Sequence, residues 1–353
     1  MKTLLRLLLK SQHQRNRSEP AQIEKGMTLI ELLIGTVMAF LIITPMLAFV
    51  VDMLNTDRRE QVKSNTEQDI QAAVDFIAQD LSQAIYIYDN NPNTGIPAIK
   101  KFLPPTGDDK IPILVFWKRQ ILEKSLPVNT TLTPQPTDCD AKAKPGEKGD
   151  CNDTYVLSLV AYYQFKNKDE TWCQPSGGAD TCPTRIARYH VQDGLENKSN
   201  DPANPYTVKS GQNTSKAYNG KAIGAIPAFD ITNPEKNVTN LGVDWDGFDV
   251  LVNYIDHSPG PILTPCTTAL GNPTDPKDTI NPLDEDTLKV TDPTKTINSF
   301  YACVDTEKNL ARVTIRGNSL RRLQANDANY NASKSAFFPT ATVQVQGLGA
   351  RGK

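Results

Sequence analysis

The clearest pattern in the chain is an apolar segment near its N-terminus. Twenty consecutive residues, Leu32–Val51, carry no charged side chain. As a helix they would extend roughly 30 Å at 1.5 Å per residue, which matches the hydrocarbon thickness of a bilayer. A buried core helix is the alternative, but a run of this length favours a membrane span.

A second helical pattern follows the apolar segment. No glycine or proline occurs over residues 52–88, and from Ile70 onward apolar residues recur every three or four positions. They form one stripe: Ile70, Ala73, Ile77, Leu81 and Ala84. Because the residues before Ile70 are much more polar, we expect the stripe to pack on a globular domain only from about Ile70. If fully helical, the chain from Met27 to Tyr88 would be roughly 93 Å long.

One proline lies within the apolar run. Pro45 lacks a backbone N–H, and its ring clashes with the carbonyl group four residues earlier, that of Leu41. We therefore expect a kink or a locally melted turn between Leu41 and Pro45.

After residue 88 the pattern changes to short runs typical of β-strands. Six runs are rich in β-branched and aromatic residues or alternate in polarity: Ile111–Trp117, Tyr155–Phe165, Arg185–Val191, Phe248–Ile255, Leu310–Ile315 and Ala341–Val345. Long Pro-, Asn-, Asp- and Thr-rich stretches separate them, notably 197–220 and 271–298, and such loops are usually functional or disordered. The predicted fold class is α+β, with a long N-terminal membrane-spanning helix packed on a β-rich globular head, residues 89–353.

Composition and charge narrow the class of protein. Of the 353 residues, 39% are hydrophobic and 22% charged, which excludes a multi-span membrane protein and a wholly disordered chain. The net charge of −2 gives no basic signature for nucleic-acid binding. Residues 1–26 carry six basic and two acidic side chains, so the remainder of the chain has a net charge of −6. This basic flank predicts a cytoplasmic leader and an exported head by the positive-inside rule.

The sequence offers little for catalysis or for a cofactor. Its three histidines, His13, His190 and His257, are not clustered, and we interpret the last two as structural. No nucleophile elbow, zinc-protease motif or phosphate-binding loop is present. We expect no enzyme, no cofactor and no metal. The loops Asp89–Gly95 and Asp244–Asp249 faintly resemble calcium loops, but turn chemistry explains both.

All six cysteines fall in the predicted head: Cys139, Cys151, Cys173, Cys182, Cys266 and Cys303. An even number confined to an exported domain favours disulfides. Six cysteines allow 15 pairings. Pairing sequence neighbours would give Cys139–Cys151, Cys173–Cys182 and Cys266–Cys303. Zinc is the alternative, but no CxxC pair or histidine cluster supports it.

The junction before the apolar run is unlike an ordinary secretory signal peptide. Its only small-residue site, Lys25-Gly26-Met27, precedes the apolar run, so a cut there would keep the helix in the mature protein. Glu31 places a carboxylate within that apolar stretch, where a charge costs about 2.5–3.5 kcal/mol on insertion scales. It needs a partner, and the obvious one is a free α-amino group at Met27, on its own or a neighbouring subunit.

The segment Gly26-Met27-Thr28-Leu29-Ile30-Glu31-Leu32 resembles the processing site of type IV pilins and type II secretion pseudopilins. The resemblance implies that a membrane peptidase removes the leader 1–26 after Gly26 and methylates Met27. It also implies that Glu31 pairs with the amine of an adjacent subunit during assembly. The transmembrane helix would then be 27–51, and the extended amphipathic helix 52–88. The family more often has Phe at the position of Met27.

Further segments resemble subgroups of this family. Residues 58–84, RREQVKSNTEQDIQAAVDFIAQDLSQA, resemble the larger minor pseudopilins of the PulJ/PilW type. The runs 310–318 and 337–346 resemble the end of cyanobacterial pseudopilins linked to hormogonium polysaccharide secretion. The resemblance implies a minor subunit of a filament that supports polysaccharide or protein secretion and surface motility.

The same resemblance implies partners and a location. The partners would be other pilins or pseudopilins, the prepilin peptidase, and an inner-membrane assembly platform powered by a separate ATPase. The chain would cross the cytoplasmic membrane once, with its head in the periplasm or, in the assembled filament, outside the cell. The alternative function is a filament-tip adhesin or substrate-binding module that uses the loops 197–220 and 271–298 for recognition.

Overall fold

The structure is a computed structural model that forms two compact units, residues 1–58 and 59–353. We call the second unit the head. Three residues are described singly, Asn233, Lys236 and Val238, and the other described residues are 28–104, 109–127, 151–166, 171–173, 182–192, 194–197, 206–209, 247–260, 264–271, 274–275, 278–291, 298–324 and 326–349.

The long helix α2 spans Leu29–Ser82, a length of 54 residues. It is assigned as helix through Pro45, so the turn there is not melted, and the alternative expectation of a kink at this residue stays a prediction. The predicted end at Tyr88 is also wrong, because Ala84–Tyr88 form strand β1. The physical reason lies in the sequence AIYIY, whose β-branched and aromatic side chains fit a pleated, half-buried surface better than a helix.

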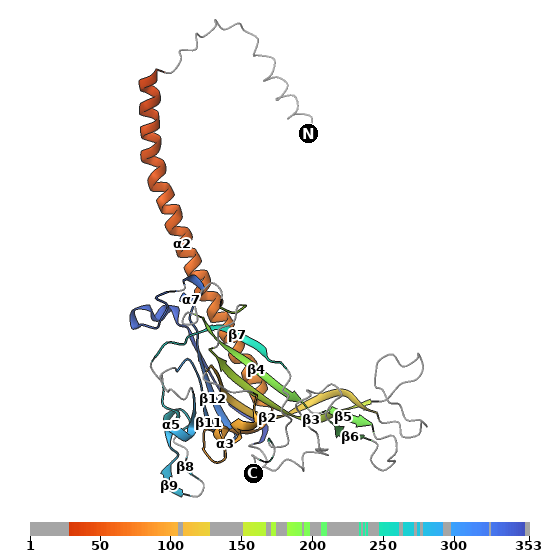
Figure 1. Ribbon diagram of the computed structural model, residues 1–353. Helices are drawn as coiled ribbons and strands as arrows, with labels where there is room; N and C mark the ends of the chain where they lie inside the picture. Colours follow the sequence, from red (N-terminus) through yellow and green to blue (C-terminus); the bar gives the residue numbers. More distant parts are fainter. Residues whose placement is uncertain are drawn as a thin grey trace, which may run out of the picture. The chain divides into compact units, whose positions relative to one another are not determined.

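The main sheet of the head has five antiparallel strands in the order β1-β2-β3-β4-β7. Beyond β1, its strands are β2 (Lys110–Pro127), β3 (Cys151–Phe165), β4 (Thr184–Gln192) and β7 (Asp249–Ile255). Four of the six predicted apolar runs fall in these strands. Figure 1 shows β2, β3, β4 and β7 beside the C-terminal part of α2.

A second antiparallel sheet has the order β10-β11-β12-β13, with strands β10 (Lys289–Val290), β11 (Phe300–Asp305), β12 (Leu310–Arg316) and β13 (Thr340–Gln346). The last two contain the remaining predicted runs. Two hairpins add β5 (Gly194–Asn197) with β6 (Tyr206–Lys209), and β8 (Thr274–Asp275) with β9 (Asp278–Pro282). Short helices are α3 (Ile96–Ile99), η1 (Lys100–Phe102), α5 (Cys266–Ala269), α6 (Glu285–Leu288), α7 (Leu320–Leu323) and η4 (Ala332–Phe337).

The predicted stripe of α2 is buried in the core of the head. Ile70, Ala73, Ile77 and Leu81 are at most 2% exposed, and they share one apolar cluster with side chains from both sheets. Packing begins one turn earlier than predicted, at Thr66, which is fully buried. The described chain thus combines a long apolar N-terminal helix with a sheet-rich head, an α+β arrangement.

A glycine lets the helix approach the second sheet. A Cβ atom at Gly317, directly after β12, would collide with the Ile70 side chain of α2 and would lie 2.9 Å from Thr66 Cγ2. Gly317 also forms an isolated β-bridge with Ile255 at the end of β7. The helix and both sheets therefore meet around a position that has no room for a side chain.

Two disulfide bonds are present among the described residues of the head. They are Cys173–Cys182 and Cys266–Cys303. Each joins two cysteines that follow one another in the sequence, as predicted. Cys139 lies outside the described residues, and nothing is described of the side chain of Cys151, so their pairing stays a prediction.

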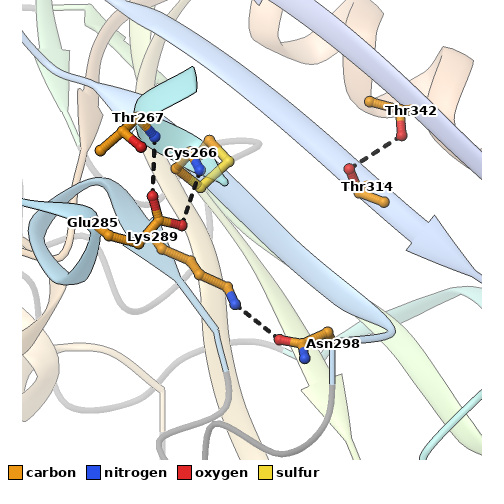
Figure 2. The surroundings of a disulfide bond; sticks show 8 residues. Cys266, Thr267, Glu285, Lys289, Asn298, Thr314 and Thr342 are labelled. Atoms are coloured by element: carbon orange, nitrogen blue, oxygen red, sulfur yellow. Dashed lines mark hydrogen bonds between the residues drawn. A yellow bond between two sulfur atoms is a disulfide. The ribbon is translucent and has the colours of Figure 1, made fainter. Parts of the chain in front are cut away.

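The bond between Cys266 and Cys303 fastens helix α5 to strand β11. Figure 2 shows the Glu285 carboxylate beside this bond, where it accepts hydrogen bonds from the N–H groups of Cys266 at 2.9 Å and Thr267 at 3.0 Å. These N–H groups begin α5 and have no acceptor within it, so the carboxylate satisfies them.

Candidate functional site: the apolar helix and Glu31

The first unit contains the apolar half of α2. Its large apolar side chains are exposed from Leu29 to Leu54, with exposed fractions between 48% for Val50 and 85% for Leu29. None of its most apolar 18-residue window is buried in the protein. By its length and composition, α2 is able to span a membrane, and it is the one such helix among the described residues.

Glu31 lies in the first turn of α2, and its carboxylate turns back to the residue that precedes the helix. Oε2 accepts from both the backbone N–H and the hydroxyl group of Thr28, and the N–H of Glu31 donates to Thr28 Oγ1, each at 3.4 Å. This reciprocal arrangement is a capping box, which satisfies N–H groups at the start of a helix. The negative charge also lies at the positive end of the helix dipole.

The capping box leaves the carboxylate available to a cation. Its distances of 3.4 Å exceed the usual upper limit of about 3.2 Å for an N–H···O hydrogen bond. A primary amine close to Thr28 would form a shorter, charge-assisted hydrogen bond. Gly26 and Met27, the predicted cleavage residue and N-terminus, lie outside the described residues, so the pairing of the Met27 amine with Glu31 stays a prediction.

The hydroxyl groups within the apolar segment are satisfied by the helix itself. Thr36 Oγ1 donates to Leu33 O at 2.9 Å, and Thr44 Oγ1 donates to Phe40 O at 2.7 Å. Pro45 has no N–H to donate to the carbonyl group four residues before it. A helix that keeps its hydroxyl groups paired internally suits a hydrocarbon environment, which offers no other partner.

Further along the helix, a buried carboxylate joins α2 to three adjacent strands of the main sheet. Asp80 Oδ1 accepts a hydrogen bond from Lys118 Nζ of β2 at 2.7 Å. Asp80 Oδ2 accepts from the Tyr162 hydroxyl of β3 at 2.7 Å and from Arg188 Nε of β4 at 2.8 Å. Burial alone would raise the pKa of Asp80, but Arg188 and Lys118 outweigh burial and hold this pKa below its usual value of 3.8. The carboxylate stays charged and fixes the helix on the sheet.

The sequence pattern did not single out Asp80, although the residue lies on the packed face of the helix. The residue is 7% exposed. It follows the buried Ile77 by three positions, a spacing that places both side chains on the same face. The spacing from Ile77 could have predicted the burial of Asp80, but the charge of Asp80 favoured a position in solvent.

His190 of β4 lies close to the same charges. Burial, together with Arg188 and Lys118, lowers the pKa of His190 to about 3. Its Nε2 atom is buried and has no hydrogen-bond partner among the described residues. The histidine is therefore neutral in the folded head at ordinary pH.

The loop at Asp89–Gly95 is built by turn chemistry. Asp89 Oδ1 accepts from Asn91 N at 3.0 Å, and Asn91 Oδ1 accepts from Asn93 N at 2.9 Å, so two Asx turns follow one another. In the described residues, no three His, Cys, Asp or Glu side chains gather in a way that could hold a metal ion. The other calcium-like segment, Asp244–Asp249, lies mostly outside these residues.

Comparison with known proteins finds no relative: no family model, no curated protein and no solved structure matches the chain.

Proposed function

We propose that this chain is a minor pseudopilin, a structural subunit of a type IV pilus-like or type II secretion-like filament. The filament would support the secretion of a polysaccharide or a protein and surface motility. The observation that carries the proposal is the register of Gly26, Met27 and Glu31 at the start of an uncharged 20-residue segment. The exposed Glu31 carboxylate, which accepts hydrogen bonds of 3.4 Å from Thr28, supports a role for it in pairing with a neighbour.

The proposal gives the two halves of α2 different tasks. The apolar half would sit in the cytoplasmic membrane before assembly and pack against other pilins in the filament afterwards. The half from Thr66 onward is bound to the head by its buried stripe and by Asp80. Disulfides in the head fit an exported, oxidising location.

The proposed partners are other pilins or pseudopilins, a prepilin peptidase that cuts after Gly26, and an assembly platform in the inner membrane driven by a separate ATPase. The alternative, a filament-tip adhesin or substrate-binding module, assigned recognition to the loops 197–220 and 271–298. Most of the loop 197–220 and a smaller part of the loop 271–298 lie outside the described residues.

The sharpest test separates the charge of Glu31 from its capping role. Glu31→Gln keeps a side chain that can complete the capping box but cannot pair with an amine. Thr28→Ala removes the hydroxyl group of the box and keeps the carboxylate. At equal membrane abundance, we expect Glu31→Gln to co-purify with the filament at least ten-fold less than wild type, and Thr28→Ala to co-purify normally.

If Glu31→Gln enters the filament as efficiently as wild type, Glu31 does not pair with the adjacent subunit on the tip side. A subunit at the filament tip has no such neighbour, so the same substitution in its partner pilins distinguishes the two cases. If the partners' carboxylates are also dispensable, the proposed assembly mechanism is wrong.

A further inference from the structure

Strand β13 forms an edge of the second sheet, and no strand among the described residues pairs with its outer side. It pairs with β12 at seven consecutive positions, from Thr340 opposite Arg316 to Gln346 opposite Leu310, without a shift in register. Every second residue of the strand, starting at Thr340, is exposed. The sheet therefore ends in a regular, accessible edge.

The hydrogen bonds at the two ends of this ladder show which backbone groups point outward. Gly317 N donates to Pro339 O and Gly347 N donates to Asn309 O, each at 2.9 Å. Because hydrogen-bonded and non-hydrogen-bonded pairs alternate between antiparallel strands, the adjacent pairs, and every second pair between them, are non-hydrogen-bonded. The N–H and C=O groups of the β13 residues in these pairs point away from β12. We call this row the β13 edge: Thr340, Thr342, Gln344 and Gln346.

The other outer strands of the two larger sheets are protected against the addition of a strand. Strand β10 has only two residues, one of which is Lys289. Strand β7 shifts its register with β4, and the Tyr254 carbonyl group accepts from Asn318 N. Two carbonyl groups of β1 accept from the side chains of Thr306 and Asn309. Short length, lysine, bulges and covering groups are common protections of sheet edges, whereas β13 has no charged residue, no proline and no bulge.

The side chains of β13 indicate the chemistry of an added strand. Ala341, Val343 and Val345 are half-buried and pack against the core of the head. On the other face, Thr342 forms a hydrogen bond with Thr314 of β12 at 3.1 Å (Figure 2). Every second side chain of an added strand would lie beside the three apolar ones, where a charge would be costly. The edge therefore suits an uncharged strand with small or β-branched apolar residues at alternate positions.

The direction of β13 argues against a second copy of this chain as the occupant. The strand starts beside Gly317, which is in close contact with Thr66 and Ile70, and it ends at Gly347, which lies against Ala84 O. Within the head, β13 therefore runs in the same direction as α2. Two copies joined symmetrically at this edge would pair antiparallel, so their α2 helices would run in opposite directions. Two chains anchored in one membrane by α2 cannot do this, and this step rests on the proposed function.

We propose that an extended, uncharged segment of a different chain adds to the second sheet beside β13. Its backbone pairs with the N–H and C=O groups of the β13 edge, and its apolar side chains extend the core. Main-chain hydrogen bonds supply the affinity in such strand additions, and alternate side chains supply the specificity. The site goes beyond the structural role proposed for α2, and it can be tested without any filament.

The probe is a fluorescent synthetic peptide with the sequence TATVQVQ and lysines outside the strand for solubility. Paired antiparallel about Val343, its Thr and Gln positions lie opposite those of the β13 edge, so the outward groups of both strands find partners. The control peptide has prolines in place of the third and fifth residues and lacks two of these N–H groups. Fluorescence anisotropy with the full chain in detergent micelles should show saturable binding of the probe and about ten-fold or more weaker binding of the control peptide.

A matched pair of variants tests the edge on the protein. Thr342→Pro removes one outward N–H group and keeps the bonds to β12, because proline is tolerated where the N–H of an edge strand faces solvent. Thr342→Val keeps this N–H group, and both variants lose the hydroxyl group that contacts Thr314. Binding of the probe should weaken about ten-fold or more in Thr342→Pro and change less than about two-fold in Thr342→Val. If Thr342→Pro melts well below Thr342→Val, the two peptides compared on the wild-type protein decide instead.

The proposal is overturned if the probe does not bind, if the proline peptide binds equally well, or if a well-folded Thr342→Pro binds the probe as wild type does. A dimer of the full chain that Thr342→Pro dissociates also overturns it, since a second copy would then occupy the edge. None of these outcomes changes the Glu31 test of the proposed function, so the two can fail separately.

Discussion

Arg188 of β4 and Asp80 of α2 form an ion pair in which Arg188 Nε lies 2.8 Å from Asp80 Oδ2. Lys118 pairs with the other oxygen of the same carboxylate at 2.7 Å. One negative charge therefore pairs with two positive charges at the boundary between the helix and the sheet. Removing one member of a buried ion pair is far more damaging than replacing the whole pair, because the remaining charge is left uncompensated.

Asp80→Asn should lower the free energy of unfolding by about 3–5 kcal/mol, since it leaves Lys118 and Arg188 buried without a counter-charge. Asp75→Asn is the matched control. Asp75 is an exposed carboxylate of the same helix that accepts from Gln71, and its loss should change stability by no more than about 0.5 kcal/mol. Urea denaturation of the full chain in detergent measures both. Equal effects of the two substitutions would contradict the anchoring role.

Acid should destabilise the head through His190. Its pKa is about 3 in the folded head and near 6.5 in the unfolded chain, so between these pH values the unfolded chain binds more protons. Stability is therefore fully present above about pH 6.5 and falls as the pH drops toward 3, with a slope of at most about 1.4 kcal/mol per pH unit. His190→Gln should flatten this slope in denaturation experiments across pH 4–7. An unchanged slope would mean that His190 titrates normally in the folded head.

Asp80 adds acid sensitivity at lower pH. Because its folded pKa lies below 3.8, its contribution is present above that pH and is lost as the pH falls through the folded pKa. The effects of His190→Gln and Asp80→Asn should therefore appear in different parts of the pH profile.

The leader should be cut between Gly26 and Met27. Gly26→Leu should block cleavage, because a bulky side chain should not fit the peptidase. Gly35→Ala, at an open position within the helix, is the control and should be processed normally. N-terminal sequencing of the membrane form measures the cut. A mature chain that starts at another residue would refute the assignment.

The exported chain should contain no free thiol. Alkylation of the folded, unreduced, metal-free protein followed by mass spectrometry should label no cysteine, whereas two or more reactive cysteines would contradict three disulfides. Loop-closure entropy predicts unequal contributions. Replacing Cys266 and Cys303 by Ser should cost about 4 kcal/mol and replacing Cys173 and Cys182 about 2.5 kcal/mol, because the first pair spans 37 residues and the second 9.

Gly317→Ala should weaken the docking of the helix on the head. Its Cβ atom would meet the Ile70 side chain, so α2 or the end of β12 must shift, at a cost of about 1–3 kcal/mol. Gly247→Ala introduces the same methyl group where no atom lies within 4 Å, and it should be nearly neutral. Thermal unfolding of both variants tests the difference, and a neutral Gly317→Ala would show that the helix adapts freely.

The sequence predicted the helix and six strands because their patterns are local. Strand β11, with the sequence FYACVD, was missed because all six of its residues are buried and it shows no alternation. The role of Asp80 depends on Lys118 and Arg188, which are 38 and 108 residues away, and no local pattern brings such partners together. Strand β7 carries an extra residue opposite β4, and such a bulge has no dependable signature in one sequence.

The bond between Cys266 and Cys303 has a mechanical consequence. If a filament pulls this chain from its two ends, tension passes from one cysteine to the other through the sulfur atoms and bypasses the residues between them. Those residues, 267–302, could otherwise extend by about 120 Å. The segment that carries β8, β9, α6 and β10 therefore bears no load, and its folding does not affect how far the stretched protein can reach.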